Sequence, residues 1–258
     1  MGGFLFNEIV FGPVSSRRFG VSLGINLLPE TMKYCTFNCV YCECGLTSED
    51  QDKRVKLFPT SEILDALEAR FKELFEKGLV PDNITYAGNG EPTIHPGFLE
   101  IIDRTIVLRD KYFPTAKITV LSNATRIHKE NVMSALLKID NNVLKLDAGT
   151  DTTFQLINRP ASPIHIEQIV DNLVKLDGKL IIQTLFLRGK SGDKIIDNTT
   201  QEEVDKWLEH LVKIKPSLVM LYSISRETAE DGLTKVSRDE LEAIAERVRL
   251  LGIETEVY

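Results

Sequence analysis

The chain has no stretch of 18 or more consecutive apolar residues, so the sequence argues against a membrane-spanning helix. Residues 1–13 also lack the basic segment, apolar stretch and small-residue cleavage site of a secretory signal peptide. No internal repeat, low-complexity tract or linker divides the 258 residues, a length that one α/β barrel can fill. We therefore expect a cytoplasmic protein with one folded domain and no membrane contact.

Positive charge is also in short supply. The 31 Lys and Arg residues are outnumbered by 38 Asp and Glu residues, which gives a formal net charge of −7. An acidic chain has no general attraction for phosphate backbones, so this balance counts against nucleic acid as the main partner. Hydrophobic residues make up 43% of the chain, which is enough for a core of good size.

Cysteine is absent from most of the chain, because all four cysteines lie between positions 35 and 44. They are Cys35, Cys39, Cys42 and Cys44. Disulfide frameworks join distant segments in oxidising compartments, and a bond within one short loop removes little chain entropy. Thiolates gathered on one soft metal centre explain this cluster of cysteines better.

Apolar periodicity predicts strands that alternate with amphipathic helices. We expect strands at 21–28, 83–87, 117–121, 143–146, 179–186 and 218–222. We expect helices at 60–77, 97–110, 129–138, 164–176, 200–214 and 238–251. Six strands, each followed by a helix, indicate an α/β fold with parallel pairing, either a partial barrel or a doubly wound sheet.

In both folds the ligand site lies at the carboxyl ends of the strands. The unusual residues of this chain follow those ends. The cysteines come after the first strand, residues 88–93 after the second, Ser122 and Asn123 at the end of the third, and Asp147 after the fourth. We therefore expect the function to lie on one face of the sheet.

The spacing of the first three cysteines favours an iron–sulfur cluster. Gaps of three and then two residues between Cys35, Cys39 and Cys42 let one loop wrap a cube-shaped cluster, with each thiolate on a different iron. The fourth iron would stay open to a ligand. The alternative is a zinc site that uses all four cysteines, although structural zinc sites usually draw paired ligands from two separated segments. Cys44 could be a fourth ligand, a redox-active thiol or a packed neutral residue.

A second motif, Tyr-Ala-Gly-Asn-Gly-Glu-Pro-Thr at 86–93, follows the second predicted strand. Gly88 and Gly90 allow a ligand to approach the backbone closely, and Glu91 supplies a negative charge suited to an ammonium group. The alternative is a tight turn between a strand and a helix.

The cysteine spacing, with the aromatic Tyr41 before the third cysteine, resembles that of the radical S-adenosylmethionine superfamily. This resemblance implies one core domain over residues 1–258, a partial (β/α)6 barrel with short N-terminal and C-terminal extensions. It also implies a 4Fe–4S cluster on Cys35, Cys39 and Cys42 whose open iron is chelated by S-adenosylmethionine. An electron from the cluster would cleave the sulfonium and give a 5′-deoxyadenosyl radical, which abstracts hydrogen from a substrate.

The second motif resembles the Gly-Gly-Glu motif of the same superfamily, with Asn89 in place of the first paired glycine. The resemblance implies that Glu91 holds the methionine amino group, and that polar groups at the next strand ends contact the ribose and the carboxylate. On the fifth strand, Gln183 could point into the barrel, and Leu187 could pack near adenine. The predicted contacts with S-adenosylmethionine are Tyr41, Gly88, Asn89, Gly90, Glu91, Ser122, Asn123, Lys145, Asp147, Gln183 and Leu187.

Residues 12–18, 88–96, 158–160 and 222–226 resemble the branch of small radical enzymes near the wyosine-type tRNA-modifying synthases. Those synthases carry a second cluster on further N-terminal cysteines, and no cysteine precedes Cys35 here. This departure and the acidic charge argue against tRNA modification.

Several cationic or polar residues near predicted loops and strand ends suit an anionic substrate, because Arg pairs well with carboxylate or phosphate. They are Arg17, Arg18, Arg159, Tyr222 and Arg226, of which we predict Arg17, Arg159, Tyr222 and Arg226 as substrate contacts. The alternative is that these residues hold loops through salt bridges.

Three functions agree with these patterns. The first is a radical oxidoreductase or modifying enzyme that acts on a small molecule, peptide or RNA base, with flavodoxin or ferredoxin as electron donor. The second is an activase that generates a glycyl radical on a partner protein. The third is a structural module that binds zinc or an iron–sulfur cluster without catalysis.

Overall fold

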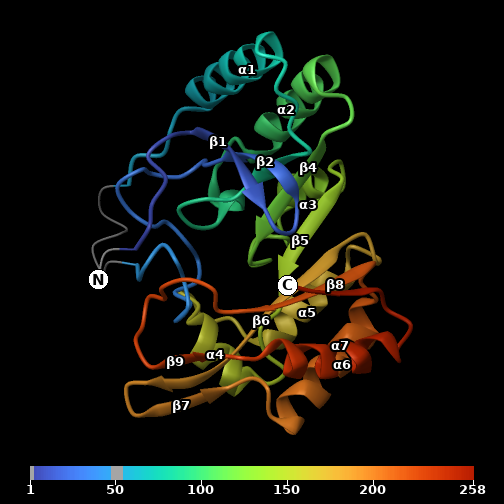
Figure 1. Cartoon of the computed structure of the whole chain (residues 1–258). Helices are drawn as coiled ribbons and strands as arrows, with labels where there is room; N and C mark the ends of the chain where they lie inside the picture. The colour runs from blue at the N-terminus through green and yellow to red at the C-terminus, as the bar shows by residue number, and fades with distance from the viewer. Residues whose placement is uncertain (1–2, 48–54) are drawn as a thin grey trace.

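The computed structural model describes residues 3–47 and 55–258, which form one curved sheet with helices packed along it (Figure 1). The strands are β1 (Val10–Ser16), β2 (Gly20–Ile25), β3 (Asn83–Tyr86), β4 (Lys117–Ser122), β5 (Asn141–Lys145), β6 (Ile181–Ser191), β7 (Lys194–Asp197), β8 (Leu218–Ser223), β9 (Leu233–Lys235) and β10 (Thr255–Val257). The helices are α1 (Thr60–Glu76), the 3-10 helix η2 (Pro92–Ile94), α2 (Phe98–Tyr112), α3 (Glu130–Leu136), α4 (Asp151–Asn158), α5 (Ile166–Val174), α6 (Gln201–Ile214) and α7 (Arg238–Arg249). No helix in this described part of the chain is both long enough and apolar enough to cross a bilayer.

The sheet has the predicted parallel core. Its strand order is β1-β2-β3-β4-β5-β6-β8-β10, and every neighbouring pair on this path is parallel except β1 and β2. The six predicted strands correspond to β2, β3, β4, β5, β6 and β8. Among the described residues no pairing joins the edge strands β1 and β10, so the sheet stays open. The predicted α/β partial barrel is confirmed.

The first half of the chain differs from the prediction at two places. Strand β1 was not predicted, and it pairs antiparallel with β2 across a register shift between Phe11 and Val14. The strand predicted at 21–28 ends at Ile25, because the Asn26 side chain accepts from and donates to the backbone of Leu28 and turns the chain.

In the second half, β6 continues beyond its predicted end at 186 and reaches Ser191. This extension pairs antiparallel with β7 and with β9, which were also not predicted. The segment 188–195 mixes Arg, Lys, Gly and Asp with few apolar residues, so it carries little strand periodicity. Helix α4 was missed as well, because its eight residues are too short for a clear helical pattern.

Side chains of the parallel strands alternate between two faces of the sheet. One face packs against the helices in the main core, which includes Ile118, Val120, Leu144, Ile182, Val219 and Leu221. The inner face carries a smaller apolar cluster of Val143, Ile181 and Met220, with Phe19, Leu121, Leu218 and Tyr258 packed against it. Two residues further along each strand, the same inner face becomes polar at Asn123, Lys145, Gln183 and Tyr222. The inner face of the sheet is therefore apolar at first and becomes polar toward the carboxyl ends of the strands. We call these two parts the apolar floor and the polar wall.

One buried carboxylate fixes the start of α4. Glu203, in the first turn of α6, accepts hydrogen bonds from the backbone N–H groups of Gly149 at 2.9 Å and Thr150 at 3.2 Å. It also accepts from the Thr153 hydroxyl at 2.8 Å. These donors lie at the N-terminus of α4, where the helix dipole favours a negative charge. Glu203 thereby joins α4 to α6.

We expect Glu203→Ala to lower the free energy of unfolding by about 1–3 kcal/mol, because several buried donors would lose their acceptor. Glu202→Ala is the matched control, since Glu202 lies in the same helical turn and is exposed. It should change stability by about 0.5 kcal/mol or less. Urea unfolding followed by circular dichroism measures both values, and equal losses in the two variants would contradict the assigned role.

Candidate active site

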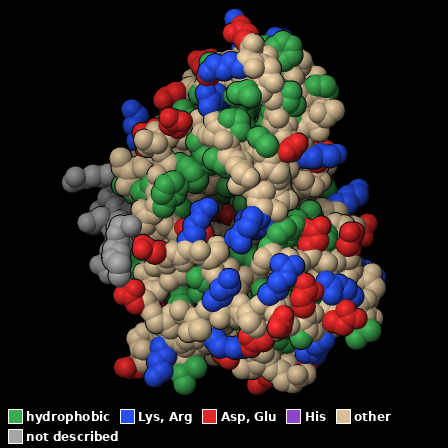
Figure 2. All heavy atoms as spheres, viewed as in Figure 1, with side chains coloured by type: hydrophobic (Ala, Val, Ile, Leu, Met, Phe, Trp, Pro, Cys, Tyr) green, Lys and Arg blue, Asp and Glu red, His purple; other side chains and the backbone are tan. Residues whose placement is uncertain are grey.

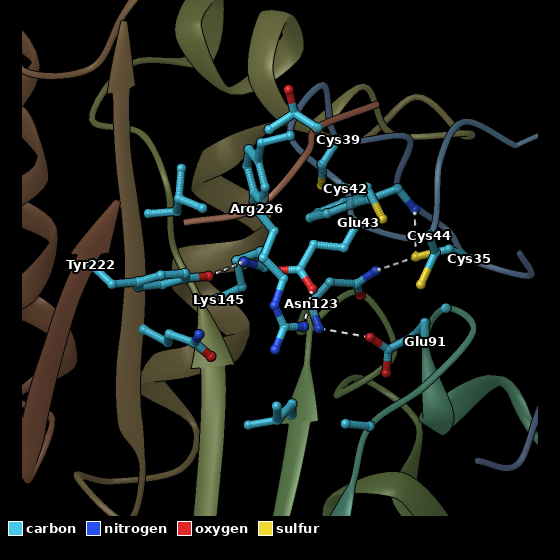
Figure 3. Close-up of a pocket in the computed structure, with 18 of the residues that line it drawn as sticks. Cys35, Cys39, Cys42, Glu43, Cys44, Glu91, Asn123, Lys145, Tyr222 and Arg226 are labelled. Atoms are coloured by element: carbon cyan, nitrogen blue, oxygen red, sulfur yellow. Dashed lines mark hydrogen bonds and ion pairs between the residues drawn. The ribbon is translucent and has the colours of Figure 1, made fainter. Parts of the chain in front are cut away.

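A cavity opens at the carboxyl ends of the parallel strands, where the polar wall of the sheet meets the cysteine loop (Figure 3). Its strand-borne lining comes from the third, fourth, fifth and sixth parallel strands: Leu121, Ser122, Asn123, Lys145, Gln183, Leu185, Tyr222 and Ser223. The loop after β8 adds Ile224, Ser225, Arg226 and Thr228. All four cysteines line the same cavity. The sequence expectation that one face carries the unusual residues agrees with this placement.

Backbone hydrogen bonds join the cysteine loop, residues 33–45, to the glycine motif, residues 86–93. The Tyr34 N–H donates to the Asn89 carbonyl at 2.7 Å, and the Glu91 N–H donates to the Tyr34 carbonyl at 3.0 Å. Gly90 lies between these bonds with φ of 143°, and a Cβ there would be 1.8 Å from the Tyr34 oxygen. Only glycine allows this approach. On its other side, the loop bonds to the end of α4 through Val40.

The first two thiols lie beside side-chain amides, Cys39 buried and Cys35 partly buried. The amide of Asn123 donates to the Cys35 sulfur at 3.6 Å, and the amide of Asn158 donates to the Cys39 sulfur at 3.4 Å. Burial raises the pKa of Cys35 to about 12, although the nearby Lys33 opposes this shift. Burial also raises the pKa of Cys39. A metal centre would therefore have to displace thiol protons on binding.

Cys44 lies close to the third cysteine of the motif. Its thiol donates to the Gly88 carbonyl at 3.6 Å, and its hydrogen bond to Cys42 lowers the pKa of Cys42 below the usual range. Burial and the same contact raise the pKa of Cys44. In this arrangement Cys44 acts as a neutral donor.

The thiols suit a cluster better than a single ion. Within residues 3–47 and 55–258, no three His, Cys, Asp or Glu side chains converge closely enough to hold one metal ion. Cys35, Cys39 and Cys42 nevertheless surround one cavity. An iron–sulfur cluster takes each thiolate on a different iron, so its ligands stand around a larger volume. Three sulfur donors on one loop also favour iron–sulfur chemistry, and the residues present fit a 4Fe–4S cluster; the Glu43 and Glu91 carboxylates line the same cavity.

Glu91 is a buried carboxylate at the edge of this cavity. It accepts hydrogen bonds from the Ser122 hydroxyl at 2.8 Å and from the Asn123 N–H at 2.7 Å. It also caps η2 through the Thr93 N–H at 3.1 Å. Burial raises its pKa, and these hydrogen bonds oppose that shift. Glu91 thus combines a turn-capping role, the alternative considered from the sequence, with a position that faces the cavity.

A charged and aromatic group forms the middle of the cavity wall. The Lys145 ammonium lies 3.6 Å from the Asp147 carboxylate, 5.0 Å from the centre of the Tyr41 ring, and donates to the Tyr222 hydroxyl at 3.2 Å. The Tyr41 hydroxyl donates a short hydrogen bond to Asp147. Burial disfavours the charge on Lys145, but Asp147 and Tyr222 together raise its pKa, so the lysine is cationic.

Three of the predicted S-adenosylmethionine contacts do not line the cavity. Asn89 is buried, and its amide donates to the Pro29 carbonyl at 2.7 Å. Asp147 is buried and accepts hydrogen bonds from the Tyr41 hydroxyl and the Asn158 amide. Leu187 is buried in the main core, and its N–H donates to Asn198 at 2.8 Å. The other predicted contacts line the cavity: Tyr41, Gly88, Gly90, Glu91, Ser122, Asn123, Lys145 and Gln183.

The predicted substrate residues also divide into two groups. Tyr222 and Arg226 line the cavity. Arg17 is exposed and donates to the Ser225 hydroxyl at 3.1 Å. Arg159, in a left-handed conformation at the end of α4, pairs with Glu230 in the loop after β8. Arg17 and Arg159 lie outside the cavity lining.

The loop after β8 is also tied directly to the cysteine loop. The Glu230 N–H donates to the Val40 carbonyl at 3.0 Å. Nearer the cavity, the guanidinium of Arg226 pairs with Glu43 at 2.8 Å. One backbone bond and one ion pair therefore join the two segments that face each other across the cavity.

Two residues near the thiols had no role in the sequence predictions. Lys33 is buried two positions before the first cysteine, and its ammonium donates to the Gly45 carbonyl at 3.1 Å. Asn158 bonds to Cys39 and also donates to Asp147 at 2.8 Å. Lys33 could have been noticed as a cation next to the cysteines. The contact of Asn158 with the loop depends on α4, which the sequence did not predict.

Comparison with known proteins identifies the class to which this fold and site belong. Residues 30–199, more than half of the chain, match the Radical SAM superfamily. The chain therefore belongs to the radical SAM superfamily. A UPF0026 protein of Synechocystis sp. is 36% identical over 217 residues, which cover 82% of this chain and 74% of that protein. Within the superfamily, the chain groups with the UPF0026 proteins.

Two other relatives are longer than the matched region. A UPF0026 protein of Methanocaldococcus jannaschii is 29% identical over 226 residues, which cover 86% of this chain and 65% of that protein. A protein named GTPase Obg, from Brachyspira hyodysenteriae, is 29% identical over 237 residues, which cover 90% of this chain and 32% of that protein. The chain thus spans less than two thirds of each of these two relatives.

Solved structures share the fold. A radical SAM methyltransferase from Sphaerobacter thermophilus superposes with a TM-score of 0.66 at 16% identity, covering 92% of this chain and 65% of that one. Native anSMEcpe with bound AdoMet gives 0.56 at 14% identity, covering 92% and 64%. Archaeal TYW1 gives 0.54 at 16% identity, covering 89% and 71%. At these identities the similarity concerns the fold alone.

We expect Gly90→Ala to destabilise the protein by about 3 kcal/mol, because the new Cβ would meet the Tyr34 carbonyl and the backbone angle is unfavourable for alanine. Gly78→Ala is the matched control. Gly78 also has a positive φ, but nothing lies within 4 Å of its Cβ position, so it should cost about 1 kcal/mol. Denaturant unfolding of both variants measures the difference. Equal losses of unfolding free energy in the two variants would mean that the close approach of Gly90 to Tyr34 does not contribute to stability.

Proposed function

We propose that this protein binds one 4Fe–4S cluster through Cys35, Cys39 and Cys42, binds S-adenosylmethionine beside it, and catalyses a radical reaction. The observation that carries the proposal is the convergence of two separate motifs. The three thiols of one loop and the Glu91 carboxylate line the same cavity in a chain of the radical SAM superfamily. When bound, the reduced cluster supplies the electron that cleaves S-adenosylmethionine to methionine and a 5′-deoxyadenosyl radical, the species that abstracts hydrogen from a substrate.

The polar side chains of the cavity suit the parts of S-adenosylmethionine. Glu91 would accept hydrogen bonds from the methionine ammonium, because its carboxylate is buried and already oriented by Ser122 and Asn123. Lys145 is cationic and suits the methionine carboxylate. Gln183, the register partner of Lys145 on the neighbouring strand, can donate to and accept from ribose hydroxyls.

Apolar residues would protect the reaction from water. Phe37, Leu121, Leu185 and Ile224 line the cavity between the polar groups. Apolar side chains that exclude water strengthen the electrostatic contacts inside a cavity and limit side reactions of a radical with water. The amides of Asn123 and Asn158 would hold the first two thiolates in place.

A small reduced carrier such as flavodoxin or ferredoxin would supply the electron, and the substrate would be a small molecule, a peptide or an RNA base. The acidic net charge makes nucleic acid the weakest of these substrates.

Cys39→Ala should abolish iron binding and the release of 5′-deoxyadenosine together, because it removes one of three cluster ligands. Cys44→Ala is the matched control and should keep both. Anaerobic reconstitution, visible absorption and an assay for 5′-deoxyadenosine after reduction measure these results. A colourless protein that holds one zinc ion, and loses it on either substitution, would instead support a structural zinc site.

Glu91→Gln should keep the cluster but weaken the binding of S-adenosylmethionine by about 10- to 100-fold, which corresponds to a charge-assisted hydrogen bond of about 1.5–3 kcal/mol. Glu100→Gln, on the exposed side of α2, is the control and should bind as the wild type does. Isothermal titration calorimetry on reconstituted protein gives both affinities. An unchanged affinity in Glu91→Gln would remove Glu91 from the binding site.

A further inference from the structure

The end of the cavity opposite the cysteines differs from the cysteine end in the side chains that line it. In Figure 3 the cysteines and Glu91 lie on one side, Tyr222 lies on the other, and Lys145 lies between them. Four cationic residues are among those that line the cavity: Arg18, Lys33, Lys145 and Arg226. Figure 2 shows a hollow near the middle of the face, beside the β1–β2 hairpin, with Lys and Arg side chains on its rim. These four cations exceed the two carboxylates of the lining, Glu43 and Glu91, although the chain as a whole is acidic.

Three of these cations have partners within the protein. Lys145 pairs with Asp147 at 3.6 Å, and Arg226 pairs with Glu43 at 2.8 Å. Lys33 donates to a backbone carbonyl in the cysteine loop.

Arg18 differs from the other three. Among residues 3–47 and 55–258 it forms no ion pair, and its Nη1 atom is buried without a hydrogen-bond partner. A buried guanidinium nitrogen without an acceptor is costly, so this position is suited to an acceptor from a ligand.

Aromatic stacking holds the Arg18 guanidinium in place. Its central carbon lies 5.1 Å from the centre of the Tyr222 ring and 5.5 Å from the centre of the Phe19 ring. Phe19 packs against the small apolar cluster on the inner face of the sheet, as Tyr258 does. A stacked guanidinium keeps its donors oriented, and an apolar surface next to it strengthens its attraction for an anion.

We propose that Arg18 binds an oxyanion of the substrate, a carboxylate or a phosphate, at the end of the cavity opposite the cysteines. The Tyr222 hydroxyl accepts its hydrogen bond from Lys145, so its own proton is free to reach the same anion. This assignment rests on the proposed function, in which Lys145 serves the methionine carboxylate. Arg18 stacks on Tyr222, and both residues line the cavity.

The test uses reconstituted protein saturated with S-adenosylmethionine and two probes, malonate for a carboxylate and inorganic phosphate for a phosphate. Calorimetry should detect one probe in the wild type and about tenfold weaker binding in Arg18→Gln. Arg17→Gln removes the same charge from the adjacent residue, outside the cavity lining, and should bind the probe as the wild type does. The probe that binds distinguishes the two kinds of anion.

Several results would overturn the proposal: no binding of either probe to the wild type, equal binding in Arg18→Gln, equal weakening in Arg17→Gln, or competition between the probe and S-adenosylmethionine. Arg18→Lys keeps the charge without the planar fork and should bind with intermediate affinity. It also provides the measurement if Arg18→Gln proves unstable in a thermal melt.

Two further measurements separate this proposal from the proposed function. Arg18→Gln should keep the cluster absorption and the slow release of 5′-deoxyadenosine without substrate, and loss of either would assign Arg18 to the cofactor site and overturn the proposal. If wild-type protein takes up no cluster but still binds a probe through Arg18, the radical function fails and the anion site stands.

Discussion

The site depends on the close contact between two pieces of backbone, the strand-like segment at Tyr34 and the glycine motif at Gly90. The two hydrogen bonds there are ordinary in length, but they form only because no Cβ separates the chains. This contact sets the distance between the thiols on one segment and the Glu91 carboxylate on the other. A cysteine loop without that support would still carry three thiols, but it would not hold them above the same cavity as the carboxylate.

Much of this arrangement could be predicted from the sequence, because it follows from local patterns. The six core strands have apolar periodicity, and parallel strands bring their carboxyl ends to one edge. Within each strand the change from apolar to polar residues on one face, as from Val143 to Lys145 or from Ile181 to Gln183, is visible in the chain itself. Most of the residues predicted at strand ends therefore line one cavity.

The remaining features depend on contacts between distant segments. Asn89 stands inside the motif, but its side chain bonds to the backbone of Pro29 and of Phe6 in the N-terminal segment. Leu187 lies just beyond the predicted strand end at 186, but β6 continues through it into a hairpin and places the residue in the core. Arg17 and Arg18 are adjacent in a turn, and only the paths of Tyr222 and Ser225 decide which one faces the cavity. No periodicity in the sequence carries that information.

The bond between Glu230 and Val40 has a consequence for variation in this family of proteins. The loop after β8 lines one side of the cavity. This bond connects its backbone directly to the backbone between the second and third cysteines. A change of loop length that suited a differently shaped reactant would also pull on the segment that carries the cysteines. The two segments are therefore expected to change together, and transplanting one of them alone between relatives would misalign the other.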